Sequence, residues 1–334
     1  MAVPSPRELA DLHPFGALAE QDREALAPYL EVTEVVAETP LVPDSRGTYA
    51  LMILRTGRAT LIREGLPAHE LVPGDAVGEL SLEYPVATAA SVVARTPIRA
   101  YGLSYRSLDR LRPVQVSTLL LLDLGRNMVG DVRGHELSQT AFGQARRAAL
   151  GLHELVARHF PHDTLHLVTY SLYARTIQPD QLAQLVWSEW EYGENLQDGL
   201  RQAQALLTGR GEQPGRILVI TNKVPSAYTE PGHATPVFSY PPTPRTVQQT
   251  LLEAARCAEA GLRIDSFLLE SAVPAWSNFL VKFATDLSRP TQGQVFVTGA
   301  RRLATQLLIA YLAYKARTTA WALPLGRLTD CSRS

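Results

Sequence analysis

The sequence predicts a multidomain chain in which an N-terminal β-roll with some helix (α+β) precedes a doubly wound, mainly parallel α/β sheet. Its 334 residues amount to about twice a typical domain length of roughly 150. The first third has short apolar runs broken by Gly, Pro and Asp, whereas from Ser117 onward apolar runs alternate with helical patterns. These observations predict two domains, at 1–112 and 116–317, and a tail at 318–334.

Five strand-length runs and two helices are expected in the first domain. A helix over Glu20–Leu30, ended or kinked by Pro28, precedes the strands, and a short helix over Tyr105–Leu111 follows them. The expected strands are Glu31–Val36, Tyr49–Arg55, Ala59–Arg63, Ala89–Ala94 and Ile98–Leu103. Several short strands at close spacing predict a roll or barrel.

The second domain is expected to consist of repeated βα units, which predict a parallel sheet with helices on both faces. The expected strands are Ser117–Leu122, Leu165–Tyr170, Arg216–Thr221, Leu262–Leu269 and Gln294–Val297. The expected helices are His135–His159, Leu196–Leu207, Thr246–Ala260, Trp276–Leu287 and Gly299–Lys315. Between them, Lys223–Arg245 is rich in proline and is expected to form a long loop without regular structure.

Composition narrows the classes of partner. The formal net charge of -1 argues against binding nucleic acid through bulk charge, so no nucleic acid partner is expected. Only two cysteines are present, Cys257 and Cys331, which favours a reducing compartment, and we expect the protein in the cytoplasm. The longest apolar runs are too short to span a bilayer, so no membrane insertion is expected.

A glycine-flanked turn in the first domain, at Pro73–Ser81, is a candidate nucleotide site. Backbone N–H groups in such a turn can hold a phosphate, and the carboxylate of Glu79 can accept a hydrogen bond from a ribose hydroxyl. The stretch resembles the cyclic nucleotide-binding domain over roughly Leu9 to Leu111. The candidate residues are Gly78, Glu79, Leu80, Thr88, Ala89 and Ser91.

The resemblance implies that Glu79 binds the ribose 2′-OH, but Thr88 stands where the family has the arginine that binds the cyclic phosphate. A guanidinium–phosphate contact contributes roughly 1.5–3 kcal/mol, so its loss weakens phosphate binding. Two interpretations stay open. The roll is a ligand-free docking or dimerisation module, or it senses a cyclic nucleotide or another anion.

Polar residues in the second domain follow predicted strands or precede a helix. Asp123 ends the first strand, Asn222 follows the third, and Glu194 comes directly before a helix. Because open α/β sheets bind ligands outside the carboxyl ends of their strands, these side chains are expected to converge at one edge.

This arrangement resembles the von Willebrand factor A (VWA) domain, a Rossmann-like fold, over roughly Val116 to Ala316. The family's metal ion-dependent adhesion site (MIDAS) has an Asp-x-Ser-x-Ser motif, a threonine and a second aspartate. Asp123 matches that motif, and four of the five ligand positions are replaced. Gly125 and Asn127 replace the serines, Glu194 the threonine and Asn222 the aspartate.

The resemblance implies Mg²⁺, which prefers oxygen ligands that Asp123, Glu194 and the amides of Asn127 or Asn222 can supply. Glu194 can also fill the coordination position that a partner's acidic residue would use. Two interpretations stay open: a weakened MIDAS-like Mg²⁺ site and a metal-independent interaction surface.

We expect a non-catalytic regulatory adaptor. Its degenerate VWA domain docks a protein partner, and its cyclic nucleotide-binding-like domain regulates or positions that docking. The resemblance implies a MoxR-type AAA+ ATPase or a larger assembly as partner, and a dimerising roll would give a homo-oligomer. Two alternatives stay open: a genuine cyclic nucleotide sensor that switches the VWA domain, and a metal-dependent enzyme that uses Asp123 and Glu194.

Overall fold

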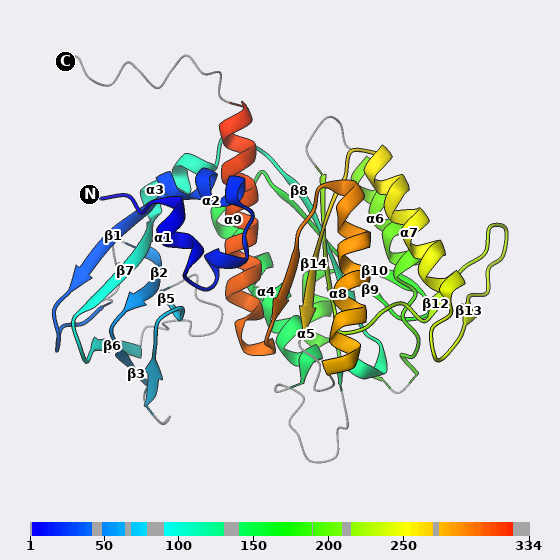
Figure 1. The fold of residues 1–334 in the computed structure, drawn as a ribbon, viewed down its shortest axis with the longest axis horizontal. Coiled ribbons are helices and arrows are strands. Elements are labelled where there is room, and N and C mark those ends of the chain that lie inside the picture. The colour runs from blue at the N-terminus through cyan, green and yellow to red at the C-terminus, as the bar shows by residue number, and fades with distance from the viewer. Residues whose placement is uncertain are drawn as a thin grey trace. The chain divides into compact units, whose positions relative to one another are not determined.

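The computed structural model describes residues 2–41, 49–63, 68–78, 90–129, 140–188, 190–208, 215–269 and 274–322. Its contacts group into two units. One comprises Met1–Val114 with Leu308–Ser334, and the other comprises Gln115–Leu307. Both units are drawn in Figure 1. Each has its own hydrophobic cluster.

The N-terminal unit contains two small antiparallel sheets. One has the order β1 (Leu30–Val35), β7 (Ile98–Ser104), β2 (Tyr49–Thr56), β5 (Ala76–Val77). The other has the order β4 (His69–Leu71), β3 (Ala59–Arg63), β6 (Ala90–Ala94). The five expected strands are all present. β4 and β5 were not expected, because two or three residues are too few to show periodicity.

Short helices flank these strands. They are α1 (Pro6–Ala10), η1 (Phe15–Ala17), α2 (Glu20–Leu26), η2 (Ala27–Tyr29) and α3 (Tyr105–Leu111). The helix expected over Glu20–Leu30 is α-helical only to Leu26, and a 3₁₀ turn that contains Pro28 follows. Proline has no N–H for the α-helical hydrogen bond, which explains the change.

The last helix, α9 (Leu303–Ala322), is longer than the expected Gly299–Lys315 and continues into the segment expected to be a tail. Its residues from Leu308 onward group with the N-terminal unit, although the expected boundaries placed those up to Arg317 in the second domain and the later ones in a tail. Within that unit, the ammonium of Lys315 donates to the carbonyl of Val114 at 2.6 Å, and Arg317 pairs with Asp22 at 3.3 Å.

The C-terminal unit is built on a six-stranded sheet, which confirms the expected mainly parallel α/β domain. The order is β10 (Ala174–Ile177), β9 (Thr164–Tyr170), β8 (Ser117–Asp123), β11 (Gly215–Thr221), β14 (Arg263–Leu269), β15 (Val295–Thr298). All neighbours are parallel except β10, which pairs antiparallel with β9. All residues of β8, β11 and β14 are buried, as central strands covered on both faces require.

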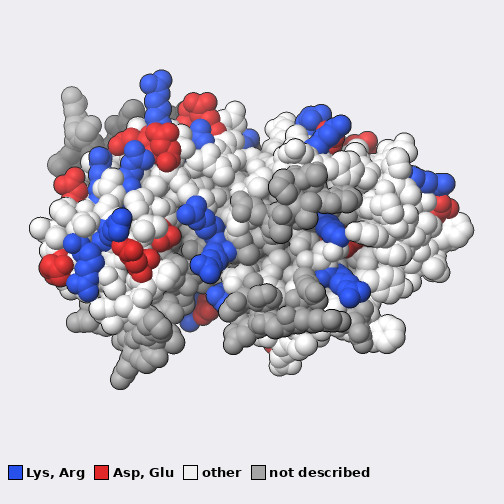
Figure 2. Space-filling view, turned by 60° about the horizontal axis from the view of Figure 1, so that its bottom comes forward, with Lys and Arg blue, Asp and Glu red and all other residues white. Residues whose placement is uncertain are grey.

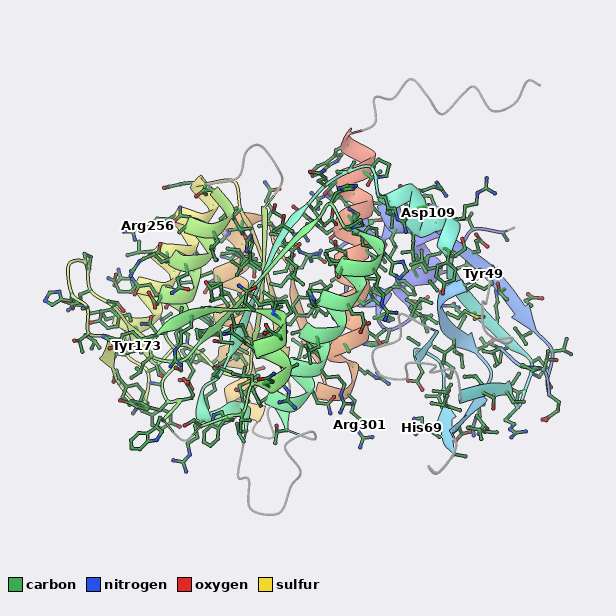
Figure 3. All side chains as sticks on the ribbon, turned by 180° about the vertical axis from the view of Figure 1, so that it is seen from behind. Tyr49, His69, Asp109, Tyr173, Arg256 and Arg301 are labelled. Carbon is green, nitrogen blue, oxygen red and sulfur yellow. The ribbon has the colours of Figure 1, made fainter. Side chains whose placement is uncertain are left out.

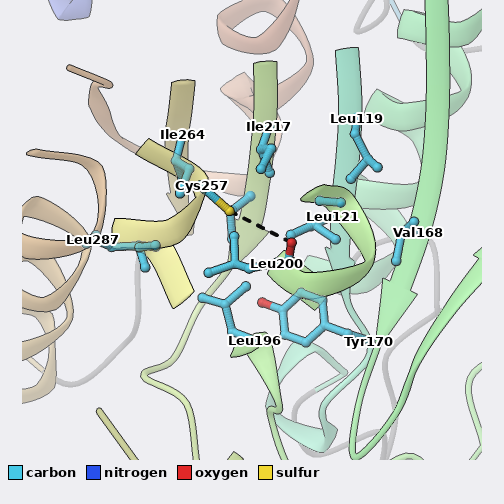
Figure 4. Packing of buried hydrophobic residues seen from close by; sticks show 14 of the residues in the cluster. Leu119, Leu121, Val168, Tyr170, Leu196, Leu200, Ile217, Cys257, Ile264 and Leu287 are labelled. Carbon is cyan, nitrogen blue, oxygen red and sulfur yellow. Dashed lines mark hydrogen bonds between the residues drawn. The ribbon is translucent and has the colours of Figure 1, made fainter. Parts of the chain in front are cut away.

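Helices cover this sheet (Figure 1). One face carries α6 (Leu196–Thr208), α7 (Pro244–Glu259) and α8 (Pro274–Ser288), and the other carries α4 (Ala141–His159), with α5 (Pro179–Gln184) packed against α4. Leu119, Ile217 and Leu200 pack in the core beneath the first group, where the thiol of Cys257 lies 3.9 Å from the carbonyl of Leu200 (Figure 4). Short 3₁₀ turns lie at η3 (Arg126–Met128), η5 (Arg289–Thr291) and η6 (Ala300–Arg302).

Two expectations for helices and loops differ from the structure. The helix expected from His135 is α-helical from Ala141, capped by the hydroxyl of Thr140, and residues 130–139 lie outside the described residues. The expectation that Lys223–Arg245 lacks regular structure was wrong. A short hairpin pairs β12 (Ala227–Tyr228) with β13 (Val237–Phe238), and α7 begins at Pro244. The prolines lie outside the paired residues, which therefore keep their N–H donors.

No helix within the described ranges combines the length and apolar character that crossing a membrane requires.

Candidate functional site

The carboxyl-terminal edge of the parallel sheet brings the five predicted site residues together. Asp123 is the last residue of β8, Asn222 directly follows β11, and Glu194 comes two residues before α6. Gly125 and Asn127 lie in the turn after β8. Strand register sets this convergence, since β8 and β11 are paired neighbours that end at the same edge.

Asp123 is completely buried, and protein donors bind both of its carboxylate oxygens. The backbone N–H of Gly125 donates to Oδ1 at 2.7 Å, and the hydroxyl of Thr221 donates to Oδ2 at 2.6 Å. Hydrogen bonds from the neighbouring strand β11 and from the turn after β8 therefore hold the carboxylate in one orientation.

Glu194 is held in the same way from the other side of the site. The amide of Asn127 donates to Oε1 at 3.0 Å, and the hydroxyl of Ser226 donates to Oε2. The backbone N–H of Glu194 in turn donates to Ser226 Oγ at 3.0 Å, and the N–H of Ser226 donates to the carbonyl of Glu194 at 3.1 Å. Each of the four carboxylate oxygens of Asp123 and Glu194 thus accepts one hydrogen bond from the protein.

Gly125 makes room for Glu194. A Cβ at this position would lie 2.6 Å from Glu194 Oε1 and 3.0 Å from Asp123 Oδ1. The φ of Gly125 is -55°, which any residue can adopt, so the need for glycine arises from space rather than from backbone conformation. The carboxylate of Glu194 therefore occupies the volume that a serine side chain would need.

Asn222 lies beside this pair and has one unused polar atom. Its Nδ2 donates to the carbonyl of Asn127 at 2.8 Å, which fixes the amide orientation. Its Oδ1 is buried and has no hydrogen-bond partner among the described residues. The site therefore contains an acceptor that the protein itself does not satisfy.

The electrostatic environment of Asp123 is unfavourable for its charge. Burial raises the pKa of Asp123 to about 7, with a further contribution from the negative charge of Glu194. The hydrogen bonds from Thr221 and Gly125, and the positive charge of Lys223, oppose that shift. Two carboxylates this close favour a proton or another cation between them.

A cavity of about 320 Å³ opens next to the pair, and we call it the edge cavity. The ammonium of Lys223 lies 5.0 Å from the centroid of the Tyr240 ring, at its wall. The lining residues are Asn127, Glu194, Asn222, Lys223, Val224, Ser226, Tyr240, Pro242, Phe279 and Leu280.

The resemblance to the VWA domain raises the question of a bound Mg²⁺ ion. Asp123, Glu194 and Asn222 Oδ1 are oxygen donors of the kind that Mg²⁺ prefers. However, Asn127 points its NH₂ group, not its oxygen, at Glu194, so it offers no ligand on that side of the site. Within the described residues no group of three or more Asp, Glu, His or Cys side chains could hold a metal. As arranged, these residues do not fit a resident Mg²⁺ ion.

The candidate nucleotide site is described only in part. Gly78 has a φ of +126°, and a Cβ there would lie 2.6 Å from the carbonyl oxygen of Ala50, so this close approach requires glycine. Ser91 lies on β6 opposite Ile62. Glu79, Leu80, Thr88 and Ala89 lie outside the described residues.

Sequence reasoning missed several residues at the sheet edge. Thr221 precedes Asn222 at the end of an apolar strand, and its position in the sequence indicates an oxygen donor at the sheet edge. Ser226 and Tyr240 reach the site only because the proline-rich segment folds back over it, and Phe279 comes from α8. No local pattern marks those three.

Relatives of this chain with curated records are uncharacterised. An uncharacterised Mycobacterium tuberculosis protein, Rv0959, is 32% identical over 207 residues, and the match covers 61% of this chain and 29% of the relative. The Mycobacterium bovis protein Mb0984 matches to the same extent. The matched region thus spans under a third of the length of these relatives.

Among solved structures, the vWF domain of a type V pilus tip protein from Porphyromonas gingivalis is 13% identical. That match has a TM-score of 0.44 and covers 65% of this chain and 99% of the other. A cAMP-binding acyltransferase from Mycobacterium smegmatis is 22% identical with a TM-score of 0.26, covering 32% of this chain and 35% of that one. Residues 117–312 match the family described as "Rv0959-like protein, vWA domain". Because that match spans more than half of the chain, the chain belongs to the Rv0959-like family of VWA-domain proteins.

Proposed function

We propose that this protein is a non-catalytic interaction protein whose VWA domain docks a protein partner at the carboxyl-terminal edge of its sheet. The observation that carries this proposal is a set of large, exposed aromatic side chains around that edge, which we call the aromatic rim. Its members are Tyr173, Trp190, Tyr192, Phe238 and Tyr240.

The aromatic rim comes from three segments that contact one another. The rings of Tyr192 and Phe238 pack edge to face with centroids 5.5 Å apart. A Cβ at Gly193 would touch both Leu172, which adjoins Tyr173, and Phe238. Figure 3 shows Tyr173 at the periphery of this domain. Tyr and Trp are enriched among the residues that dominate binding at protein interfaces.

The exposure of these rings is large for a surface without a partner. Trp190 is 80% exposed and Tyr240 is 65% exposed. In Figure 2, which brings the carboxyl-terminal edge forward, the described residues of the VWA domain are mostly uncharged, with a few Lys and Arg side chains and few acidic ones. A depletion of charge with exposed aromatic groups is typical of the centre of an interface.

The geometry at Asp123 and Glu194 supports a metal-independent and non-catalytic role. A general acid or base must reach a substrate, whereas protein hydrogen bonds to all four oxygens hold these carboxylates in fixed orientations. Asp123 is also completely buried. In this proposal, Asp123 and Glu194 have a structural role and form a rigid base beneath the docking surface.

A cross-linking experiment on the full chain tests the docking surface. A photoreactive phenylalanine analogue replaces Trp190 in the rim, and in the matched control it replaces Leu252, which is 48% exposed on α7. We expect a discrete cross-linked protein from a lysate of the source organism only with the rim probe, and its loss in the Tyr240→Ala, Phe238→Ala background. Equal cross-linking from both positions would contradict the proposal. A MoxR-type AAA+ ATPase stays a prediction for that partner.

For the N-terminal unit we propose a cyclic nucleotide-binding-like roll that regulates or positions the docking without a bound nucleotide. The antiparallel sheets and the glycine-dependent close approach at Gly78 support the architecture. Calorimetry of the full chain with cyclic AMP and cyclic GMP separates this role from a sensor. We expect no saturable heat; saturable heat that disappears in Glu79→Ala would establish the sensor instead.

A further inference from the structure

The edge cavity has the size of a side-chain pocket. Its volume of about 320 Å³ is at the lower end of the roughly 300–1,000 Å³ range for small-molecule sites, so a single side chain fits it better than a nucleotide does. Its charged lining residues are Glu194 and Lys223, and Asp123 lies beside Glu194.

The polar groups of the cavity wall include carboxylate and amide oxygens that can accept further hydrogen bonds. Asn127 and Asn222 each donate one amide N–H, and Ser226 donates its hydroxyl, to acceptors within the protein. Acceptors are left over, because a carboxylate oxygen can accept two hydrogen bonds and each oxygen of Glu194 accepts one. The buried Oδ1 of Asn222 is a further acceptor, and no described residue donates a hydrogen bond to it. A ligand that brings donors complements this wall.

Aromatic rings at the cavity also favour a cation. Tyr240 is 65% exposed and Phe279 is 45% exposed. The ammonium of Lys223 already lies 5.0 Å from the centroid of Tyr240, so this ring is positioned to accept a positive charge over its face.

We propose that the edge cavity receives an arginine side chain of the protein partner. The guanidinium donates to the carboxylate of Glu194 and stacks on Tyr240. Arginine fits better than lysine, because its planar group donates several hydrogen bonds in one plane and stacks on aromatic faces. This inference rests on the proposed docking function and names the chemistry of the partner.

The polarity of the site is thereby opposite to that implied by the VWA resemblance. There the partner supplies an acidic group to a metal ion, whereas here the chain supplies the acidic group, Glu194, and the partner supplies the cation. Gly125 is what permits Glu194 to occupy this place.

The charge of Lys223 allows a test of whether the partner group in the cavity is positive or negative. Its ammonium competes with an incoming guanidinium, so removing that charge strengthens the binding of arginine. If the partner group were acidic, Lys223 would be its counter-ion and the same substitution would weaken binding. Lys223→Gln therefore distinguishes the two chemistries in one measurement.

The experiment titrates the full chain with three blocked tripeptides, acetyl-Gly-Xaa-Gly-amide, where Xaa is arginine, its neutral isostere citrulline, or glutamate. Binding is followed by NMR shifts of side-chain amide and indole groups. We expect saturable binding of the arginine peptide, and binding about tenfold weaker or less for the other two, as the loss of a charge-assisted hydrogen bond predicts.

Three variants complete the design. Lys223→Gln is expected to tighten the arginine peptide, and Tyr240→Ala, at an exposed position that does not endanger folding, is expected to weaken it. Glu194→Gln is expected to weaken it about tenfold, with far-ultraviolet circular dichroism as the check on folding. Absence of saturable arginine binding, equal binding of citrulline, or preference for glutamate would overturn the arginine proposal. Cross-linking at Trp190 tests docking independently, so failure of one is distinguishable from failure of the other.

Discussion

Two completely buried aspartates lie at opposite ends of the strands of the same sheet, and the charged groups that act on them most strongly have opposite signs. Asp265, near the amino end of β14, contacts the guanidinium groups of Arg216 and Arg263 and accepts the N–H of Gln294 at 2.6 Å. Asp123, at the carboxyl end of β8, has another carboxylate, Glu194, as the neighbour whose charge acts on it most strongly, and the charge of Lys223 opposes that effect. Both side chains are 0% exposed.

The pKa shifts follow from these neighbours. Burial alone would raise the pKa of Asp265, but Arg216 and Arg263 outweigh burial and lower it below 3.8. Burial and Glu194 together raise the pKa of Asp123 to about 7. The comparison indicates that the amino edge holds a structural cluster in which two guanidinium groups balance the charge of Asp265, whereas the carboxyl edge pairs two carboxylates that a cation from outside can complement.

The largest effect is expected at the amino edge. Asp265→Asn keeps the shape of the side chain but removes the carboxylate that pairs with two buried arginines, which costs about 3–5 kcal/mol of unfolding free energy. Urea unfolding measures this loss. The control Asp286→Asn removes an exposed pair with Arg289 and is expected to cost under about 1 kcal/mol. A loss of the same small size at Asp265 would show that the cluster is not structural.

The two aspartates are expected to give opposite pH dependences of stability. The folded-state pKa of Asp123 lies above its unfolded value, so its contribution is complete below pH 3.8 and is lost as the pH rises to about 7. The slope in that window is about 1.4 kcal/mol per pH unit. For Asp265 the folded-state pKa is lowered, so its contribution is present above pH 3.8 and is lost below it.

Asp123→Asn isolates the first of these two dependences. The variant is expected to lose the decline in stability between pH 4 and pH 7, because an amide does not titrate there. Unfolding free energies of both proteins across pH 4–8 measure the difference. Parallel curves for variant and wild type would contradict the raised pKa of Asp123.

A smaller effect is expected from Gly125→Ala, which places a methyl group 2.6 Å from Glu194 Oε1. Overpacking of this kind costs about 1–3 kcal/mol. A double-mutant cycle with Glu194→Ala is the measurement. Because truncation of Glu194 removes the closest contact and leaves only Asp123 Oδ1, 3.0 Å from the new methyl group, the cost of Gly125→Ala should fall clearly in that background. An unchanged cost would place the conflict elsewhere.

The smallest effect is expected from Mg²⁺. Calorimetry of the full chain at pH 7.5 should show no saturable heat, because the described residues offer no group of three or more Asp, Glu, His or Cys ligands and Asn127 turns its NH₂ group toward Glu194. Saturable heat that is absent in Asp123→Asn would instead establish a metal site at the carboxyl edge and remove the contrast between the two aspartates.

Strands and helices were largely predictable from the sequence, since continuous apolar runs such as Thr118–Leu122 can be satisfied only inside a covered sheet. The convergence of Asp123, Glu194 and Asn222 was predictable for a related reason, because parallel strands end at a common edge. Short elements without periodicity, among them β10 and the β12–β13 hairpin, were not predictable.

The sequence by itself determined which residues lie inside and which polar groups reach the edge, because burial and strand polarity are properties of local pattern. Only the tertiary structure decided that Glu194 fills the space above Gly125, that Ser226 and Tyr240 return to the same place, and that α9 groups with the N-terminal unit from Leu308. Those contacts join residues that are far apart in the chain, and their hydrogen bonds and volumes exist only once the chain is packed.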